Sequence, residues 1–230
     1  MSHHTDTPGV RAYKRSMCFS AFASFSTGTI LVVVGAACMR RSEGWREWPY
    51  VLIPVCFGVQ QFIEGGLWLS LGASQQCLSA QLTAGYSVFS QVLWPIYIPL
   101  AVYLLEPAGM RRRLIGLVAA GGAAVGGYLA WYMAQTPVVA FVRGEHIVYV
   151  FPHFHQPFAT VLYLFAACAA PLTSSRVHVR WFGVCASLSL LATAYFYAQW
   201  FISSWCFFAA WLSMTIWLFF AKRTRLVSAA

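Results

Sequence analysis

The sequence predicts an all-α membrane protein, a seven-transmembrane helix bundle with a short extracytoplasmic β-hairpin between its fourth and fifth spans. Hydrophobic residues make up 60% of the chain and charged residues only 9%, whereas soluble domains carry about 25% charged residues. The Lys and Arg residues lie in short loops between long apolar stretches, and about 20 apolar residues suffice to cross a bilayer as a helix. Helices satisfy their own backbone hydrogen bonds in lipid, which makes a helical bundle the expected architecture.

The transmembrane domain is expected over residues 17–221, between a flexible N-terminal tail, 1–16, and a basic cytoplasmic tail, 222–230. The final 41 uncharged residues of this domain are long enough for two spans. Prolines are expected to bend the second span near its start and the third span in its second half. The seven spans are expected at 17–39, 49–73, 81–105, 114–133, 158–172, 181–199 and 203–221.

The fourth span is rich in glycine and contains the pair Gly122 and Gly126. This G-x-x-x-G spacing lets a second helix approach closely in a membrane, so it predicts tight helix packing.

The segment after the fourth span has a different pattern. Two β-branched and aromatic runs, 138–142 and 146–150, flank the tripeptide Arg143-Gly144-Glu145. Such runs joined by a short glycine-containing turn predict a β-hairpin. The segment is too short to cross a bilayer, so we expect it to cover the outer end of the bundle as a lid.

The distribution of basic residues predicts the orientation in the membrane. Cytoplasmic loops carry an excess of Lys and Arg, so the richer side is expected to face the cytoplasm, with the N-terminus outside. We expect contact with anionic lipids and no nucleic-acid partner, because the Lys and Arg residues lie in loops between apolar spans, a pattern that marks orientation and lipid contact. The richer side holds Arg40, Arg41, Arg46, Arg111, Arg112, Arg113, Arg176, Arg180, Lys222, Arg223 and Arg225; the other holds Arg11, Lys14, Arg15 and Arg143. His178, in the loop 174–180, is expected to be solvated.

Glu64 is the candidate functional residue, because an ionisable group inside hydrocarbon is costly and usually functional. No Lys or Arg lies within a predicted span, which leaves three states for this carboxylate: protonated, hydrogen-bonded to Gln, Ser or His, or bound to a cation. The residues expected to line its pocket are Gln60, Gln61, Ser87, Gln91 and Tyr197, with Ser90 as a further hydrogen-bond partner.

The predicted orientation brings further metal-binding residue types to the same outer side. Carboxylate, imidazole and thiolate together suit zinc or copper. In an extended segment, His153 and His155 share a face, because residues i and i+2 point the same way. The candidate metal ligands are Glu64, His146, His153, His155, Cys18 and Cys206. Two alternatives remain: a neutral Glu64 that only fixes helix packing, and a proton or cation path through it. Cys18 and Cys206 could also form a disulfide on an oxidising outer face.

Several short motifs carry a family resemblance. They are Met17-Cys18-Phe19-Ser20-Ala21, Gln61-Phe62-Ile63-Glu64, Arg143-Gly144-Glu145-His146, Pro152-His153 and Ser203-Ser204-Trp205-Cys206. With them the chain resembles a family of uncharacterised bacterial seven-transmembrane proteins, which implies the bacterial cytoplasmic (inner) membrane and no particular activity. The span number and orientation are also distantly similar to ceramidase-like membrane hydrolases, which hold zinc through histidines, but their H-x-x-x-H is absent from residues 203–221.

The sequence thus predicts an integral membrane protein whose extracytoplasmic polar pocket around Glu64 binds a metal ion or small ligand. As an enzyme it would perform metal-assisted hydrolysis, with Glu64 as the catalytic general base or a metal ligand. One alternative is a non-catalytic membrane subunit or sensor that binds a partner helix, a lipid, a cofactor or another copy of itself. The other is a proton-coupled carrier.

Overall fold

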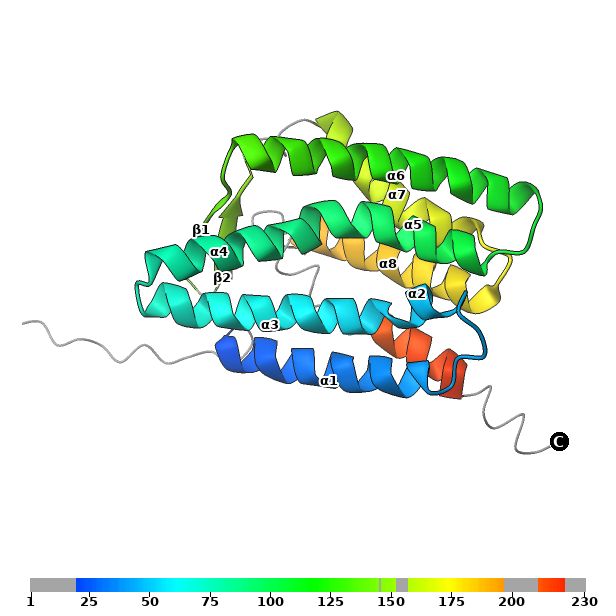
Figure 1. Ribbon diagram of the computed structural model, residues 1–230, viewed down its shortest axis with the longest axis horizontal. Helices are drawn as coiled ribbons and strands as arrows, with labels where there is room; N and C mark the ends of the chain where they lie inside the picture. Colours follow the sequence, from blue (N-terminus) through cyan, green and yellow to red (C-terminus); the bar gives the residue numbers. More distant parts are fainter. Residues whose placement is uncertain (1–19, 145, 152–156, 197–210, 222–230) are drawn as a thin grey trace, which may run out of the picture.

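The computed structural model shows a bundle of antiparallel helices with a small two-stranded sheet at one end (Figure 1). The structure describes residues 20–144, 146–151, 157–196 and 211–221. The elements are α1 (Ala21–Met39), α2 (Trp48–Val51), α3 (Ile53–Gly72), α4 (Gln76–Ser87), the π-helix η1 (Val88–Leu93), α5 (Trp94–Leu105), α6 (Met110–Gln135), β1 (Val139–Arg143), β2 (His146–Val150), α7 (Pro157–Thr173) and α8 (Val177–Phe196). A further helical segment covers Trp211–Ala221.

The helices have the lengths and compositions of membrane spans. Within the described residues, four are long and apolar enough to cross a bilayer: Ala21–Met39, Trp48–Gly72, Gln76–Leu105 and Met110–Gln135. They coincide with the first four predicted spans. Shorter apolar helices, Phe158–Thr173, Val177–Ala192 and Trp211–Ala221, lie where the other three are expected. These features indicate a helical membrane protein.

The second span, Trp48–Gly72, is interrupted at Leu52, close to the bend predicted at its start. Helix α2 ends at Val51 and α3 begins at Ile53, with Pro54 in the first turn of α3. Proline lacks an N–H but is tolerated in the first turn, where that donor has no helical partner. Pro54 therefore stands beside the interruption, near the start of the span where a bend was predicted.

The third span begins at Gln76, earlier than expected, and widens into the π-helix η1 before α5. Pro95 lies in the first turn of α5 and Pro99 inside it. In a regular α-helix the ring of Pro95 would clash with the carbonyl of Gln91, and its missing N–H would leave that carbonyl without a donor. The wider π turn directly before Pro95 accommodates both effects.

Helices α1 and α3 pack through glycines. A Cβ built on Gly28 would lie 3.0 Å from the carbonyl oxygen of Gly58, and one on Gly58 would lie 2.9 Å from that of Gly28. Figure 1 shows the two helices side by side along their length. Close approach of this kind supplies the van der Waals contact that holds helices together in lipid.

The predicted glycine pair of α6 packs closely as well. A Cβ on Gly122 would overlap the carbonyl oxygen of Pro95, and one on Gly126 would lie 2.7 Å from the side chain of Ile96. The G-x-x-x-G prediction is confirmed, with α5 as the partner helix.

The predicted β-hairpin is present. Strands β1 and β2 pair antiparallel, with Arg143 opposite His146. Gly144 in the turn has a φ of +65°, a left-handed conformation that glycine adopts without strain. The ring of Tyr149 in β2 stacks on Tyr86 in α4, with centroids 4.5 Å apart, so the hairpin is anchored to the bundle.

The predicted cytoplasmic loops meet at the opposite end of the bundle. Ser174 Oγ donates to a Glu106 carboxylate oxygen at 2.7 Å, and Arg176 Nε donates to the Leu105 carbonyl at 3.0 Å. These bonds join the loop after α5 to the loop after α7, at the end farthest from the hairpin (Figure 1). We call this the basic end, after its residues Arg40, Arg41, Arg46, Arg111, Arg112, Arg113, Arg176 and Arg180.

His178 differs from the sequence prediction. It is not in a solvated loop, because α8 already begins at Val177. Its ring stacks on Phe219 with centroids 3.4 Å apart and meets Tyr50 edge-on at 6.1 Å. His178 therefore packs between elements that are far apart in the sequence, which the charged neighbours in its own loop could not indicate.

Candidate functional site

Glu64 lies on the inward face of α3 and is only 4% exposed. Gln61, one turn earlier, donates from Nε2 to Glu64 Oε2 at 3.2 Å. Residues three apart on a helix are neighbours, so this bond follows directly from the sequence spacing. It gives the buried carboxylate a defined orientation.

Gln60 connects α3 to α5. Its Oε1 accepts a hydrogen bond from Trp94 Nε1 at 2.8 Å, and the Trp94 ring stacks on Phe57 with centroids 3.9 Å apart. Both residues are buried, so the bond satisfies a polar group of each. This contact fixes the end of η1 against the middle of α3.

Helix α4 runs antiparallel to α3, and its register is fixed by two contacts. Ser79 Oγ donates to Ser70 Oγ at 3.0 Å, and a Cβ on Gly85 would lie 3.9 Å from the side chain of Ile63. Two residues after Gly85 in α4 is Ser87, and two residues before Ile63 in the antiparallel α3 is Gln61. Ser87 and Gln61 are therefore level with each other. The polar residues of α3 and those at the α4–η1 junction therefore lie at the same depth of the bundle.

Two oxygens at this depth have no hydrogen-bond partner within the described part of the chain. They are Ser87 Oγ and Gln91 Oε1, and the two residues are 0% and 1% exposed. A buried polar atom left unpaired costs about 1–3 kcal/mol, so each such atom calls for a water, ion or ligand that would pair with it. Gln91 lies within η1, and π-helical turns are frequent at functional sites.

The π-helix is also tied to α7. Tyr163 donates from its hydroxyl to the carbonyl of Ser90 at 2.6 Å, so the irregular backbone beside Gln91 has a fixed partner.

Tyr163→Phe is expected to lower the free energy of unfolding by about 1–2 kcal/mol, because the Ser90 carbonyl loses a buried donor. The measurement is reversible unfolding in mixed detergent micelles. Tyr128→Phe, at an exposed position of α6, is the matched control; equal effects for the two variants would contradict the role given to Tyr163.

The family comparison covers all of this region. The sequence model of a family of unknown function, DUF6629, matches residues 17–230. The chain belongs to the DUF6629 family. No curated protein and no solved structure matches it.

The structure places some of the predicted site residues of this DUF6629 protein. Glu64, Gln60, Gln61, Ser87 and Gln91 are buried in the bundle, and Ser90 lies between the last two in sequence. His146 is half-buried in β2, next to the hairpin turn. The remaining predicted residues, Cys18, His153, His155, Tyr197 and Cys206, lie outside the described residues.

Metal ligands are not grouped in the part of the DUF6629 fold that the structure describes. There, no three His, Cys, Asp or Glu side chains lie together so as to hold a metal ion. The partner shown for the Glu64 carboxylate is instead the amide of Gln61, on the same helix.

Sequence reasoning missed the aromatic residues that support the polar site, Trp94, Tyr163 and the Tyr86–Tyr149 pair. Trp94 follows Gln91 by three residues and thus shares its helix face. This spacing could have predicted from the sequence that Trp94 supports the polar site. Tyr163 has no such signal, because its partner is a backbone carbonyl 73 residues away.

Proposed function

We propose that this protein crosses the bacterial cytoplasmic membrane seven times, with its N-terminus outside, and binds a cation or a small polar ligand at the site around Glu64. The observation that carries the proposal is the pair of unpartnered buried oxygens, Ser87 Oγ and Gln91 Oε1, level with the Gln61–Glu64 hydrogen bond. A ligand that donates hydrogen bonds to these oxygens, or a cation that they coordinate, would remove the free-energy cost of burying them.

The donor set of the site favours a hard ligand. Carboxylate, amide and hydroxyl oxygens suit hard cations such as Na⁺, Ca²⁺ or a protonated amine. Glu64 supplies a negative charge, Gln91 and Ser87 supply neutral oxygens, and Gln61 orients the carboxylate. A second candidate is a zinc- or copper-dependent hydrolase, in which His146, His153 and His155, with Cys18 and Cys206, would complete a softer ligand set around Glu64.

The orientation rests on where the basic residues gather. The arginines of the loop after α1, of the first turn of α6 and of the α7–α8 junction lie at the basic end, whereas the hairpin lies at the other end (Figure 1). An excess of Arg on one side is typical of the cytoplasmic face. With seven spans, the Glu64 site would open toward the outer compartment.

Elemental analysis of detergent-purified protein tests the proposed site. The wild-type protein is expected to retain a cation in stoichiometric amount. Glu64→Gln is expected to lose this cation, because the substitution removes the negative charge of the carboxylate. Glu47→Gln, at the basic end, is the matched control and is expected to retain the ion.

Three other results would change the assignment. Loss of zinc or copper in both Glu64→Gln and His153→Ala would favour the hydrolase. Equal ion content in the Glu64→Gln and wild-type proteins would contradict the cation site. An ion-free wild type that co-purifies with a larger complex would favour a non-catalytic membrane subunit.

A further inference from the structure

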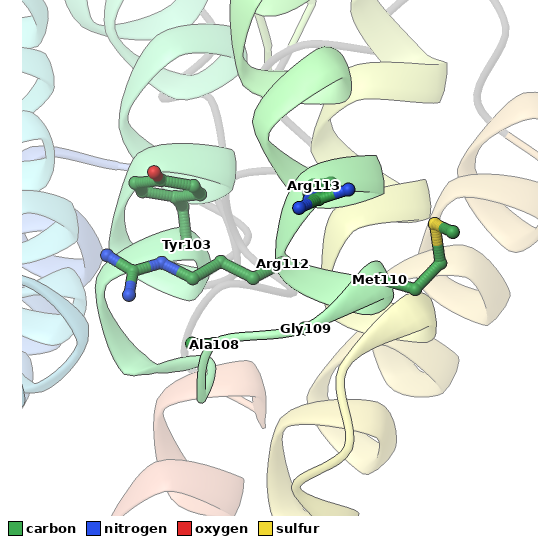
Figure 2. Close-up of a pocket in the computed structure, with 6 residues that line it drawn as sticks. All are labelled: Tyr103, Ala108, Gly109, Met110, Arg112 and Arg113. Carbon is green, nitrogen blue, oxygen red and sulfur yellow. The ribbon is translucent and has the colours of Figure 1, made fainter.

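The basic end contains a cavity of about 630 Å³ between the last turn of α5 and the first turn of α6. Figure 2 shows its lining, which comprises Tyr103, Ala108, Gly109, Met110, Arg112 and Arg113. Its volume falls within the range of about 300–1,000 Å³ that is usual for small-molecule sites. It lies at the opposite end of the bundle from the hairpin and is separate from the Glu64 site.

The two arginines border this cavity from one helix. The guanidinium of Arg112 extends alongside Tyr103, 4.6 Å from the ring centroid, and Arg113, the next residue of α6, also lines the cavity. The Nε of Arg112 is buried and has no hydrogen-bond partner among the described residues. A cation held against an aromatic ring stays oriented, and its remaining N–H groups can donate to an anion in fixed directions.

The charge in this cavity is uncompensated. Its lining includes two arginines and no acidic residue. A neighbouring cavity of about 400 Å³ is lined by Arg46 and Arg176 together with three acidic residues, Glu43, Glu47 and Glu106, so its arginines are outnumbered by carboxyl groups. An anion is therefore favoured in the first cavity and not in the second.

The backbone at the cavity adds to the same preference. Helix α6 begins after Gly109, and no side chain caps its N-terminus. The first N–H groups of a helix lack partners within it, and the helix dipole favours negative charge there. Gly109 has a φ of +156°, and a Cβ at this position would meet nothing within 4 Å, so the loop leaves space in front of these donors.

An apolar face runs from the cavity along α6. Met110, Leu114 and Leu117 are 70%, 46% and 71% exposed, and their spacing puts them on one side of the helix. In a membrane protein such a face lies against acyl chains. An amphiphile could therefore place its anionic group at the arginines and its chains on this face.

We propose that this cavity binds the phosphate of an anionic phospholipid headgroup. Arg112 and Arg113 hold the phosphate oxygens, the first turn of α6 adds backbone donors, and Met110, Leu114 and Leu117 contact the acyl chains. The site would fix the depth of α5 and α6 in the bilayer at the basic end.

Native mass spectrometry of the protein from mixed phosphatidylglycerol and phosphatidylcholine nanodiscs tests this site. The wild type is expected to retain phosphatidylglycerol in preference to phosphatidylcholine. Arg112→Gln/Arg113→Gln is expected to weaken phosphatidylglycerol binding by about 100-fold, because each guanidinium loses a charge-assisted hydrogen bond to the phosphate. Arg111→Gln/Arg180→Gln removes the same charge at the basic end without touching the cavity and is expected to weaken binding much less.

Two results would overturn the proposal. Equal losses in the two double variants would show general attraction of anionic lipid to the basic end and no defined site. Displacement of the lipid by inorganic phosphate or glycerol 3-phosphate at equal concentration would assign the cavity to a free phosphate. Arg113 is exposed, so Arg113→Gln alone, with an expected loss of about tenfold, provides the same test against Arg111→Gln if the double variant does not fold.

Discussion

Gly122→Ala is expected to lower the free energy of unfolding by about 2–3 kcal/mol. A Cβ at this position would overlap the backbone carbonyl of Pro95, and a backbone atom cannot move aside as the end of a side chain can. Helices α5 and α6 would have to separate, which loses the close contact that stabilises them in lipid. Inserting one carbon into a packed interface typically costs about 1–3 kcal/mol. Because the overlap here is with a backbone atom, we expect a cost in the upper part of that range.

Gly127→Ala provides the control for this prediction. Gly127 lies on the same helix, but a Cβ there would meet nothing within 4 Å. Alanine is a better helix former than glycine by about 0.5–1 kcal/mol, so this variant is expected to be neutral or slightly more stable. Reversible unfolding in mixed detergent micelles measures the stability of both variants. Equal destabilisation would mean that the α5–α6 contact does not cause the stability loss of Gly122→Ala.

Glu106→Gln is expected to destabilise the protein by about 2 kcal/mol at neutral pH and much less in acid. The Glu106 carboxylate accepts bonds from Ser174 Oγ at 2.7 Å and from the Ser175 N–H at 2.8 Å, and hydrogen bonds to a charged group contribute about 1.5–3 kcal/mol. Burial alone would raise the pKa of Glu106, but the hydrogen bonds from Ser174 and Ser175 and the nearby Arg111 outweigh burial and lower it below 4.5.

The sign of the pH dependence follows from that shift. A carboxyl group whose pKa is lower in the folded state stabilises the protein above its unfolded pKa, and the contribution disappears as the pH falls through the folded value. The wild type is therefore expected to lose stability below about pH 4.5, and the Glu106→Gln variant is expected to lack this part of the decline. Parallel pH profiles for the two proteins would contradict the prediction.

Glu47 provides a comparison of opposite sign. Burial raises the pKa of Glu47 above its ordinary value, and the charge of Arg176 only partly opposes this. Ionisation of Glu47 therefore disfavours the folded state as the pH rises. Glu47→Gln and Glu106→Gln are expected to change the pH profile of stability in opposite directions, although both remove one carboxylate at the basic end.

Most of the polar site on α3 could be predicted from local spacing. Glu64 and Gln61 are three residues apart in an apolar helix, so their hydrogen bond and their shared inward face follow from helix geometry. The partner on η1 could be anticipated only as a polar helix face with Ser87, Ser90 and Gln91. The unpartnered state of Ser87 and Gln91 depends on the register between α3 and α4, which no local pattern specifies.

The amino-acid sequence by itself determined the membrane class, the positions of the apolar helices, the hairpin and the glycine pair of α6. Each of these follows from hydrophobicity, residue spacing or backbone freedom within a few neighbouring residues. Only the tertiary structure decided that Pro95 follows a π-helix, that His178 packs under Phe219, that Ser174 and Ser175 hold Glu106, and that Arg112 and Arg113 border a cavity without an acidic residue. These contacts join segments that are distant in the chain, and their geometry depends on how whole helices pack against one another.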